Sequence, residues 1–161
     1  METGDELRFD HGDETPARLR GQLSRLLGMT AVQTGRVASD ALAAVGAHKN
    51  HFMVLAALAE FGDASQADLS GRTRIYTSDL VSVLNDLVKG GWVRRAPDPA
   101  DKRRNVITIT GAGERRLAEL DRVLDGVNEH VMAPLDGEER ARLFALLGRI
   151  NAHLADQPEG A

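Results

Sequence analysis

The sequence contains no cysteine, which excludes disulfides, thiolate metal sites and cysteine-based redox switches. Any signal that the protein senses must therefore act through other chemistry. No stretch approaches the roughly 18 uninterrupted apolar residues that a transmembrane helix needs. The first six residues, METGDE, are acidic and lack the basic-then-apolar order of a secretory signal peptide. We therefore expect a cytoplasmic protein without membrane contact.

Signatures of common catalytic sites are missing as well. The chain has no G-x-S-x-G segment, no P-loop and no H-E-x-x-H segment. The glycine pair Gly111 and Gly113 is better explained by a turn from a strand into a helix than by phosphate binding. We expect no enzyme and no cofactor.

Charge is unevenly distributed along the chain. The net charge is −4, yet residues 89–116 hold eight basic and three acidic side chains, a net of +5, so that the remainder carries −9. A positive segment on an acidic body favours binding to one anionic surface. The hydrophobic content of 42% suffices for a packed core, and 161 residues fit one domain or one domain with an added helical layer.

Apolar periodicity predicts a mainly helical N-terminal half. Residues 1–14 are charged and aperiodic, which indicates a disordered acidic arm. Thr15 and Pro16 form a start signal for a helix over 16–44. Three glycines weaken this helix, and a kink is therefore expected.

Three shorter helices follow before the pattern changes. The first is expected over 51–60, the second from a capping box that begins at Ser65 to about Gly71, and the third from a cap at Thr77 or Ser78 to the glycines at 90–91. The period then becomes that of strands, because 92–95 and the β-branched segment 106–110 can pair as a hairpin. The intervening loop, 96–105, carries two prolines and several charges.

A short capped helix, a turn, a longer helix and a hairpin follow one another in the order of a winged helix. The expected fold class is mainly α (α+β): a winged helix-turn-helix over 48–110 and a helical dimerisation region over 15–47 and 111–161. Two helices, with predicted caps at Thr110 and Asp136, support the second part. Their apolar stripes contain Leu117, Leu120, Leu124, Val127 and Val131, then Leu143, Leu147, Ile150 and Leu154. Both an intrachain core and a seam between subunits fit these stripes, and we favour the seam.

The longer helix of the pair would present its N-terminal residues to the base edges of DNA. Hydroxyls at Thr77, Ser78 and Ser82 can donate to phosphates or bases, and Val81 could contact a thymine methyl group. Asp79 adds a negative charge on this side. It could accept from a cytosine amino group or weaken binding.

The loop of the hairpin carries three consecutive cations, Lys102, Arg103 and Arg104. At a loop tip they could reach the DNA backbone or a narrow minor groove, which attracts arginine. Asp101 would hold a neighbouring arginine through a charge-assisted hydrogen bond. A charge run alone is more often a solvated loop, but the helix-turn-helix directly upstream favours DNA contact.

Two segments resemble the MarR family of winged-helix regulators: DPADKRRNVITITGAG at 98–113 and LNDLVKGGWVRR at 84–95. The likeness extends over about 16–155. It implies a dimer built from the terminal helices, a pseudo-palindromic operator in double-stranded DNA, and relief of binding by a small, often aromatic or anionic, effector. The family's DNA contacts correspond to Ser65, Gln66, Arg72, Arg74, Thr77, Ser78 and Ser82, and its wing-tip contacts to Lys102, Arg103 and Arg104.

The recognition helix departs from the family pattern. Many members carry threonine and arginine where this chain has Val81 and Ser82, and aspartate and arginine where it has Asn85 and Asp86. Fewer phosphate contacts are expected from this helix, and the wing should carry more of the affinity. The acidic residues Asp79 and Asp86 also motivate an alternative, a dimeric ligand-binding or protein-interaction module that has lost groove reading.

Two histidines at i and i+3, His48 and His51, could in principle bind a metal. No cysteine and no adjacent acidic residue supports them, so no metal site is expected. By position in the family, Arg25, His48 and His51 are instead weak candidates for binding an anionic effector. The function predicted from sequence is that of a ligand-responsive, dimeric DNA-binding regulator, most simply a repressor.

Overall fold

The computed structural model describes residues 15–156, so the acidic arm expected over 1–14 lies outside the described residues. The chain divides into two compact units, Met1–Leu124 and Asp125–Ala161. Within residues 15–156, no helix is long and apolar enough to cross a membrane.

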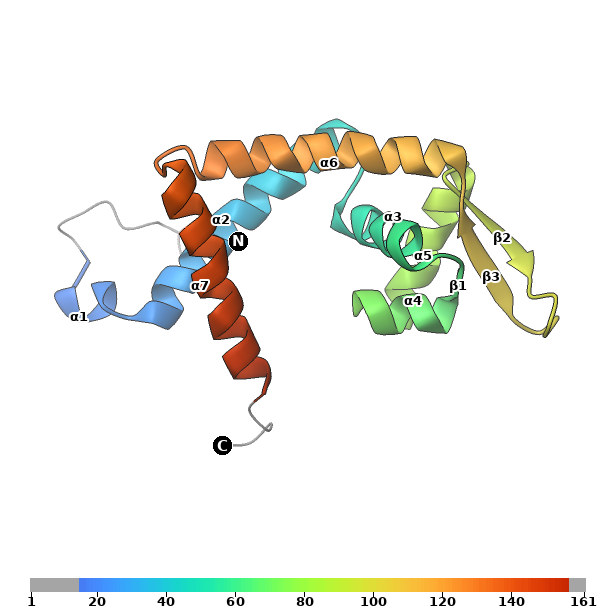
Figure 1. Cartoon of the computed structure of the whole chain (residues 1–161), viewed down its shortest axis with the longest axis horizontal. Helices are drawn as coiled ribbons and strands as arrows, with labels where there is room; N and C mark the ends of the chain where they lie inside the picture. The colour runs from blue at the N-terminus through green and yellow to red at the C-terminus, as the bar shows by residue number, and fades with distance from the viewer. Residues whose placement is uncertain (1–14, 157–161) are drawn as a thin grey trace, which may run out of the picture. The chain divides into compact units, whose positions relative to one another are not determined.

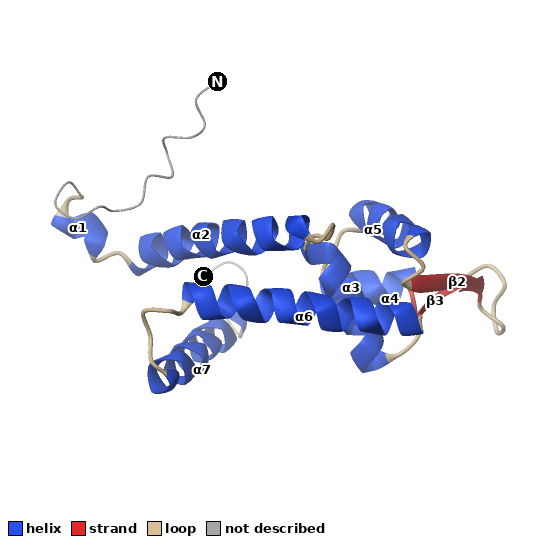
Figure 2. Cartoon of the chain, turned by 90° about the horizontal axis from the view of Figure 1, so that it is seen from above, coloured by secondary structure: helices blue, strands red, loops and turns tan. Residues whose placement is uncertain are grey.

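The first unit contains the winged helix. Its elements are α1 (Ala17–Arg20), α2 (Leu23–Ala44), α3 (Lys49–Phe61), β1 (Ala64–Ser65), α4 (Gln66–Thr73), α5 (Thr77–Lys89), β2 (Val93–Pro97), β3 (Asn105–Ile109) and most of α6 (Gly111–Val131) (Figure 1). The second unit contains the end of α6 and α7 (Gly137–Ala155). Helices dominate and the strands form one small sheet (Figure 2), which confirms the mainly α (α+β) fold class.

The long helix expected over 16–44 is interrupted near its start. Gly21 ends α1, and Gln22, in an extended conformation, precedes α2. The break falls at the first of the three glycines that were expected to weaken this helix. The other two, Gly28 and Gly35, lie within α2 without interrupting it.

The core of the winged helix forms where α3, α5 and β3 meet. Leu55, Leu84 and Ile107 are fully buried there, and Leu120 of α6 joins them. Leu117 and Leu124 pack against the same cluster. The first half of the α6 stripe therefore belongs to the core of its own chain, and the predicted intersubunit seam is wrong for this part. The lobe needs an apolar cover, and α6 supplies it within the chain.

Apolar side chains of the other terminal helices remain uncovered in the single chain. On α2, Leu23 and Leu26 are more than half exposed, and on α7 so are Phe144 and Leu154. Large exposed apolar side chains that gather on a helix are typical of an interaction surface.

The sheet has three strands in the order β1-β3-β2, all antiparallel, rather than the two expected. The additional strand, β1, pairs Ala64 with Ile107 and Ser65 with Val106. It joins the start of α4 directly to the second strand of the wing. A two-residue strand shows no alternation in sequence, so only its pairing partner reveals it.

Three of the five predicted helix caps are present, and the one expected at Thr15 is wrong, because Pro16 directly precedes α1. Ser65 accepts a hydrogen bond from the backbone N–H of Asp68, Asp136 accepts one from Glu139, and Thr110 accepts one from Gly113. The cap expected at Thr77 or Ser78 is wrong, because Tyr76 precedes α5 and its side chain makes no capping hydrogen bond. The preceding turn, and not the local residue preference, decides where α5 begins.

Candidate nucleic-acid interface

The turn between α4 and α5 fixes the start of the helix that would read DNA. Arg74 adopts the left-handed conformation (φ 56°), which is rare for a residue with a side chain. The Ser70 hydroxyl donates to the carbonyl of Ile75 at 2.7 Å, and the Ile75 side chain is buried. These contacts place Thr77 and Ser78 at the first turn of α5 and leave both exposed.

The N-terminus of α5 has properties that suit a phosphate group. Its first N–H groups donate no hydrogen bond to the side chain of Tyr76, and the helix dipole makes this end positive. Tyr76 itself is 79% exposed. Tyr76 was not predicted from the sequence, although a large aromatic residue directly before a recognition helix could have indicated it. Ser82 lies one turn further along and is exposed, whereas Asp79 in the first turn opposes a phosphate.

The wing loop is held by its own two aspartates. The Asp98 carboxylate accepts from the backbone N–H of Ala100 at 2.8 Å, and the Asp101 carboxylate accepts from that of Arg103 at 3.0 Å. Such bonds to a main chain two residues on are typical of aspartate in turns. The loop is closed by main-chain bonds from Asp98 N–H to the Arg104 carbonyl and from Arg104 N–H to the Asp101 carbonyl.

These contacts refine the role predicted for Asp101. Its carboxylate holds the main chain of Arg103, where the sequence suggested a bond to an arginine side chain. The side chains of Lys102, Arg103 and Arg104 are all exposed on the loop. Asp101 therefore orients the wing tip through the backbone and leaves the guanidinium groups available for a ligand.

The wing and the start of α4 form one surface. Ser65, Gln66, Arg103 and Arg104 together line a depression of about 280 Å³. Hydrogen bonds from the side chain and backbone of Ser65 hold the pKa of the Asp68 carboxyl below its usual value, and the positive charges of Arg104 and Arg72 act in the same direction. Residues that lie about 38 positions apart in sequence therefore share a basic surface.

The two remaining predicted arginines lie at the other end of α4. The Arg72 guanidinium stacks over the ring of Phe61, with its carbon 5.1 Å from the ring centre. Arg74 lines a second depression of about 430 Å³ together with Lys49, Tyr76 and Asp79. Sequence reasoning did not identify Lys49, because nothing local links the start of α3 to the turn before α5.

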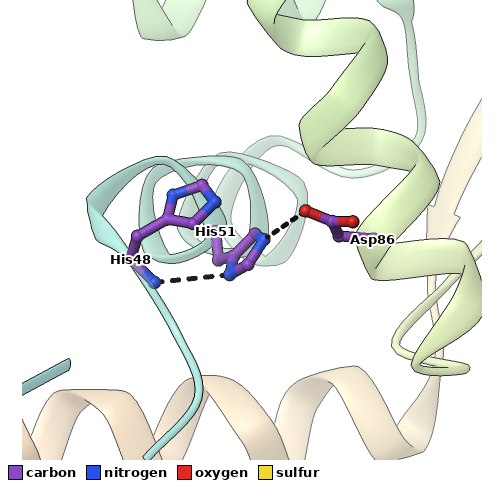
Figure 3. A group of neighbouring side chains, drawn as sticks. All are labelled: His48, His51 and Asp86. Carbon is purple, nitrogen blue, oxygen red and sulfur yellow. Dashed lines mark hydrogen bonds and ion pairs between the residues drawn. The ribbon is translucent and has the colours of Figure 1, made fainter. Parts of the chain in front are cut away.

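The two candidate histidines meet a residue that the sequence analysis did not place beside them. The rings of His48 and His51 lie 3.6 Å apart, and His51 Nε2 is 3.4 Å from a carboxylate oxygen of Asp86 on α5 (Figure 3). Burial, and next the neighbouring His48, lower the pKa of the His51 imidazole below its usual value of 6.5, which leaves the ring neutral at neutral pH. The third candidate, Arg25, lies half-buried near the start of α2.

Residues 45–104 match the model of the MarR family. Among characterised proteins, the transcriptional regulator HosA of Escherichia coli O111:H- is 31% identical over 102 residues, which covers 63% of this chain and 76% of HosA. The transcriptional repressor NicR of Pseudomonas putida is 25% identical over 143 residues, covering 86% of this chain and 87% of NicR.

Solved structures share the fold. A mutant of E. coli MarR in complex with operator DNA superposes with a TM-score of 0.67 at 24% identity, covering 80% of this chain and 92% of that one. BpsR of Bordetella bronchiseptica, described as regulated in its DNA binding by 6-hydroxynicotinic acid, superposes with a TM-score of 0.71 at 22% identity, covering 89% and 100%. The similarity thus extends from the winged helix to most of the described chain.

Proposed function

This chain belongs to the MarR family of transcriptional regulators, which are not enzymes, and we propose that it is a ligand-responsive repressor that binds a pseudo-palindromic operator as a homodimer. The observation that carries the proposal is the basic surface shared by the wing tip and the start of α4. The complex of MarR with operator DNA and the repressor name of NicR support the same function. A cytoplasmic location is part of this proposal, because a repressor acts where the DNA lies.

In the proposed complex, α5 enters the major groove and the wing contacts the backbone or the minor groove. Thr77, Ser78 and Ser82 are exposed on α5 for contacts with bases or phosphates, and Ser65 with Gln66 adds polar contacts beside the wing. Arg72, Arg74, Lys102, Arg103 and Arg104 supply the positive charge. We add Tyr76 to the residues proposed to contact DNA, because its side chain is 79% exposed.

The proposed dimer uses the terminal helices, over 15–47 and 111–161, and leaves the winged helix over 48–110 to bind DNA. The exposed apolar side chains of α2 and α7 support this division. Two recognition helices about 34 Å apart would then face successive turns of the major groove.

The interface can be tested at Phe144, which is 61% exposed on α7. Changing Phe144→Glu should raise the dimer dissociation constant by at least about 100-fold, because burying a phenylalanine contributes ~1.5–3 kcal/mol and each dimer contains two. Sedimentation analysis at micromolar concentration measures the effect. Phe61→Glu is the matched control, since Phe61 is 57% exposed but lies on α3. A native chain that is already monomeric would contradict the dimer.

The decisive test of function is fluorescence anisotropy of the purified chain with duplex DNA from its own upstream region, over a series of salt concentrations. Three wing cations on each of two lobes predict about six phosphate contacts, hence a log–log slope of about −5 against salt. Binding should exceed that of a scrambled duplex by ~10³-fold or more. Weak binding that ignores sequence would instead favour the alternative, a dimeric ligand-binding or protein-interaction module.

A small effector would release the operator, as the description of BpsR suggests for that protein. The depression lined by Lys49, Arg74, Tyr76 and Asp79 has room for a small aromatic acid and offers two cations and a phenol against one carboxylate. It suits an anion better than the surroundings of His48 and His51, where the Asp86 carboxylate lies beside an uncharged ring. Adding aromatic carboxylic acids to the same anisotropy assay tests the release.

A further inference from the structure

We propose that His48, His51 and Asp86 bind a divalent transition-metal ion such as Zn²⁺, Co²⁺ or Ni²⁺. Each of the three residues offers one ligand atom, and these atoms all lie within 4.8 Å of one another (Figure 3). Two of the ligands come from the start of α3 and the third from α5, 35 residues later. No acidic residue lies adjacent to the two histidines in the sequence, but the fold brings Asp86 beside them.

The distance between His51 and Asp86 fits two ligands of one ion. Nε2 and the carboxylate oxygen are 3.4 Å apart, whereas a strong charge-assisted hydrogen bond is about 2.7–2.9 Å long. Bonds of about 2.0–2.2 Å from a tetrahedral zinc ion place neighbouring ligand atoms about 3.3–3.5 Å apart. The pair therefore already has the separation that coordination requires.

His48 can complete the set with a side-chain rotation. It lies directly before α3, three residues from His51, and residues three apart on a helix are neighbours. Its side chain is exposed, and its ring already contacts that of His51. Two imidazoles and one carboxylate leave a fourth position for water, and this donor set suits Zn²⁺ and its neighbours better than Mg²⁺ or Ca²⁺.

Coordination requires the His51 ring to give up both of its hydrogen bonds, the one from the His48 backbone N–H and the one between Nε2 and Asp86. The backbone N–H of His48 now donates to His51 Nδ1 at 3.4 Å, which leaves the ring proton on Nε2. A metal on Nε2 moves that proton to Nδ1, and the contact from His48 is given up. At 3.4 Å this contact is weak, and His48 must turn in any case to bring its own ring to the ion.

The charge around the cluster also admits a cation. The Asp86 carboxylate supplies a negative charge at the edge of the His51 ring. Arg116 supplies an opposing positive charge, and its guanidinium group pairs with Glu119 at 2.6 Å and donates to the carbonyl of Val45. That ion pair offsets much of its repulsion.

The test uses the full chain, stripped of metal with a chelator and titrated at pH 7.5 with Co²⁺, followed by its absorption bands, and with Zn²⁺, followed by calorimetry. We expect one ion per chain. His48→Gln and Asp86→Asn should each weaken binding by at least about tenfold, the loss typical even of residues that only support a metal site. Both residues are exposed, so the variants avoid the risk that a change at buried His51 carries for folding.

Two matched controls keep the site unchanged. His130→Gln removes an exposed histidine of α6, and Asp79→Asn removes the same charge as Asp86→Asn from the same helix. Both should bind metal as the native chain does. Equal affinity in all five proteins, or no binding of one ion per chain, would overturn the proposal. The assay contains no DNA, so a metal-binding chain that ignores every duplex would refute the proposed function and not this site.

Discussion

Replacing Arg103 by alanine is expected to weaken operator binding by about 100-fold without unfolding the protein. The loss of one arginine contact costs about 1–3 kcal/mol, and a dimer loses two. Arg103 is exposed, and the bond that orients it joins the Asp101 carboxylate to its backbone N–H. Alanine keeps that N–H, so the turn of the wing should persist and the effect should report the guanidinium group alone.

The salt dependence of the variant separates two roles for this side chain. If Arg103 neutralises a phosphate, the log–log slope against salt should become shallower by about 2, one contact from each lobe. If it reads base edges in the minor groove, the variant should instead lose its preference over a scrambled duplex. Anisotropy with both duplexes measures the two quantities together.

The matched control is Arg122→Ala, which removes an exposed arginine of α6 that is not part of the wing tip. Its affinity for the operator should stay within about twofold of that of the native chain, because a single distant charge acts only through screened interactions. An Arg103→Ala protein that binds as tightly as this control would refute the proposed role of the wing.

Local signals in the sequence predict the elements of the winged helix well. Ser65, Thr110 and Asp136 each cap the helix that they were expected to cap, since the bond joins residues only three apart. The wing loop and the order of the helices follow from the change of periodicity and from the two prolines. These features depend on neighbours along the chain.

Features that depend on distant partners were missed or misassigned. The strand β1 exists only because Ala64 pairs with Ile107, and α5 begins after Tyr76 because the preceding turn is packed in place by Ile75. The apolar stripe of α6 has the spacing of a coiled coil, and spacing cannot distinguish a partner subunit from the core of the same chain. Leu120 fills that core.

In the candidate site, too, contacts between neighbours along the chain were predicted and contacts between distant residues were not. The wing cations and the hydroxyls of α5 were found as contiguous motifs, whereas the contact between His51 and Asp86 joins two elements that no local pattern connects. Asp86 was interpreted from sequence as a charge that weakens groove reading. In the structure it contacts α3, and it therefore no longer supports the alternative function as strongly as Asp79 does.

Replacing Gly113 by alanine is expected to cost about 3 kcal/mol or more of the free energy of unfolding. A Cβ atom at this position would lie 2.0 Å from the carbonyl oxygen of Trp92 and 2.7 Å from a side-chain carbon of Ile109. The first obstacle is backbone, which cannot rotate away as a flexible side chain can. Either α6 must shift or the base of the wing must open, and overpacking of this kind costs ~1–3 kcal/mol even where neighbours are side chains.

The same junction is fixed by Thr110. Its hydroxyl lies 2.7 Å from the carbonyl of Gly91 and 3.1 Å from that of Trp92, and it accepts from the N–H of Gly113. A shift of α6 therefore breaks bonds on both sides of the wing. The Thr-x-x-Gly segment at 110–113 has a structural cause: the threonine joins the end of β3 to the turn between α5 and β2, and the glycine lets α6 approach.

Gly126→Ala provides the matched control, because it makes the same change in the same helix where an added Cβ meets no atom within 4 Å. Alanine is a better helix former than glycine by about 1 kcal/mol, so this variant should be slightly more stable than the native chain. Thermal unfolding at one fixed protein concentration should lower the Tm of Gly113→Ala by about 6–12 °C and raise that of Gly126→Ala by about 2–4 °C. Equal Tm values for the two variants would contradict this prediction. They would mean that the winged helix can shift at Gly113 to make room for the added Cβ, and that the wing is not rigidly attached to α6.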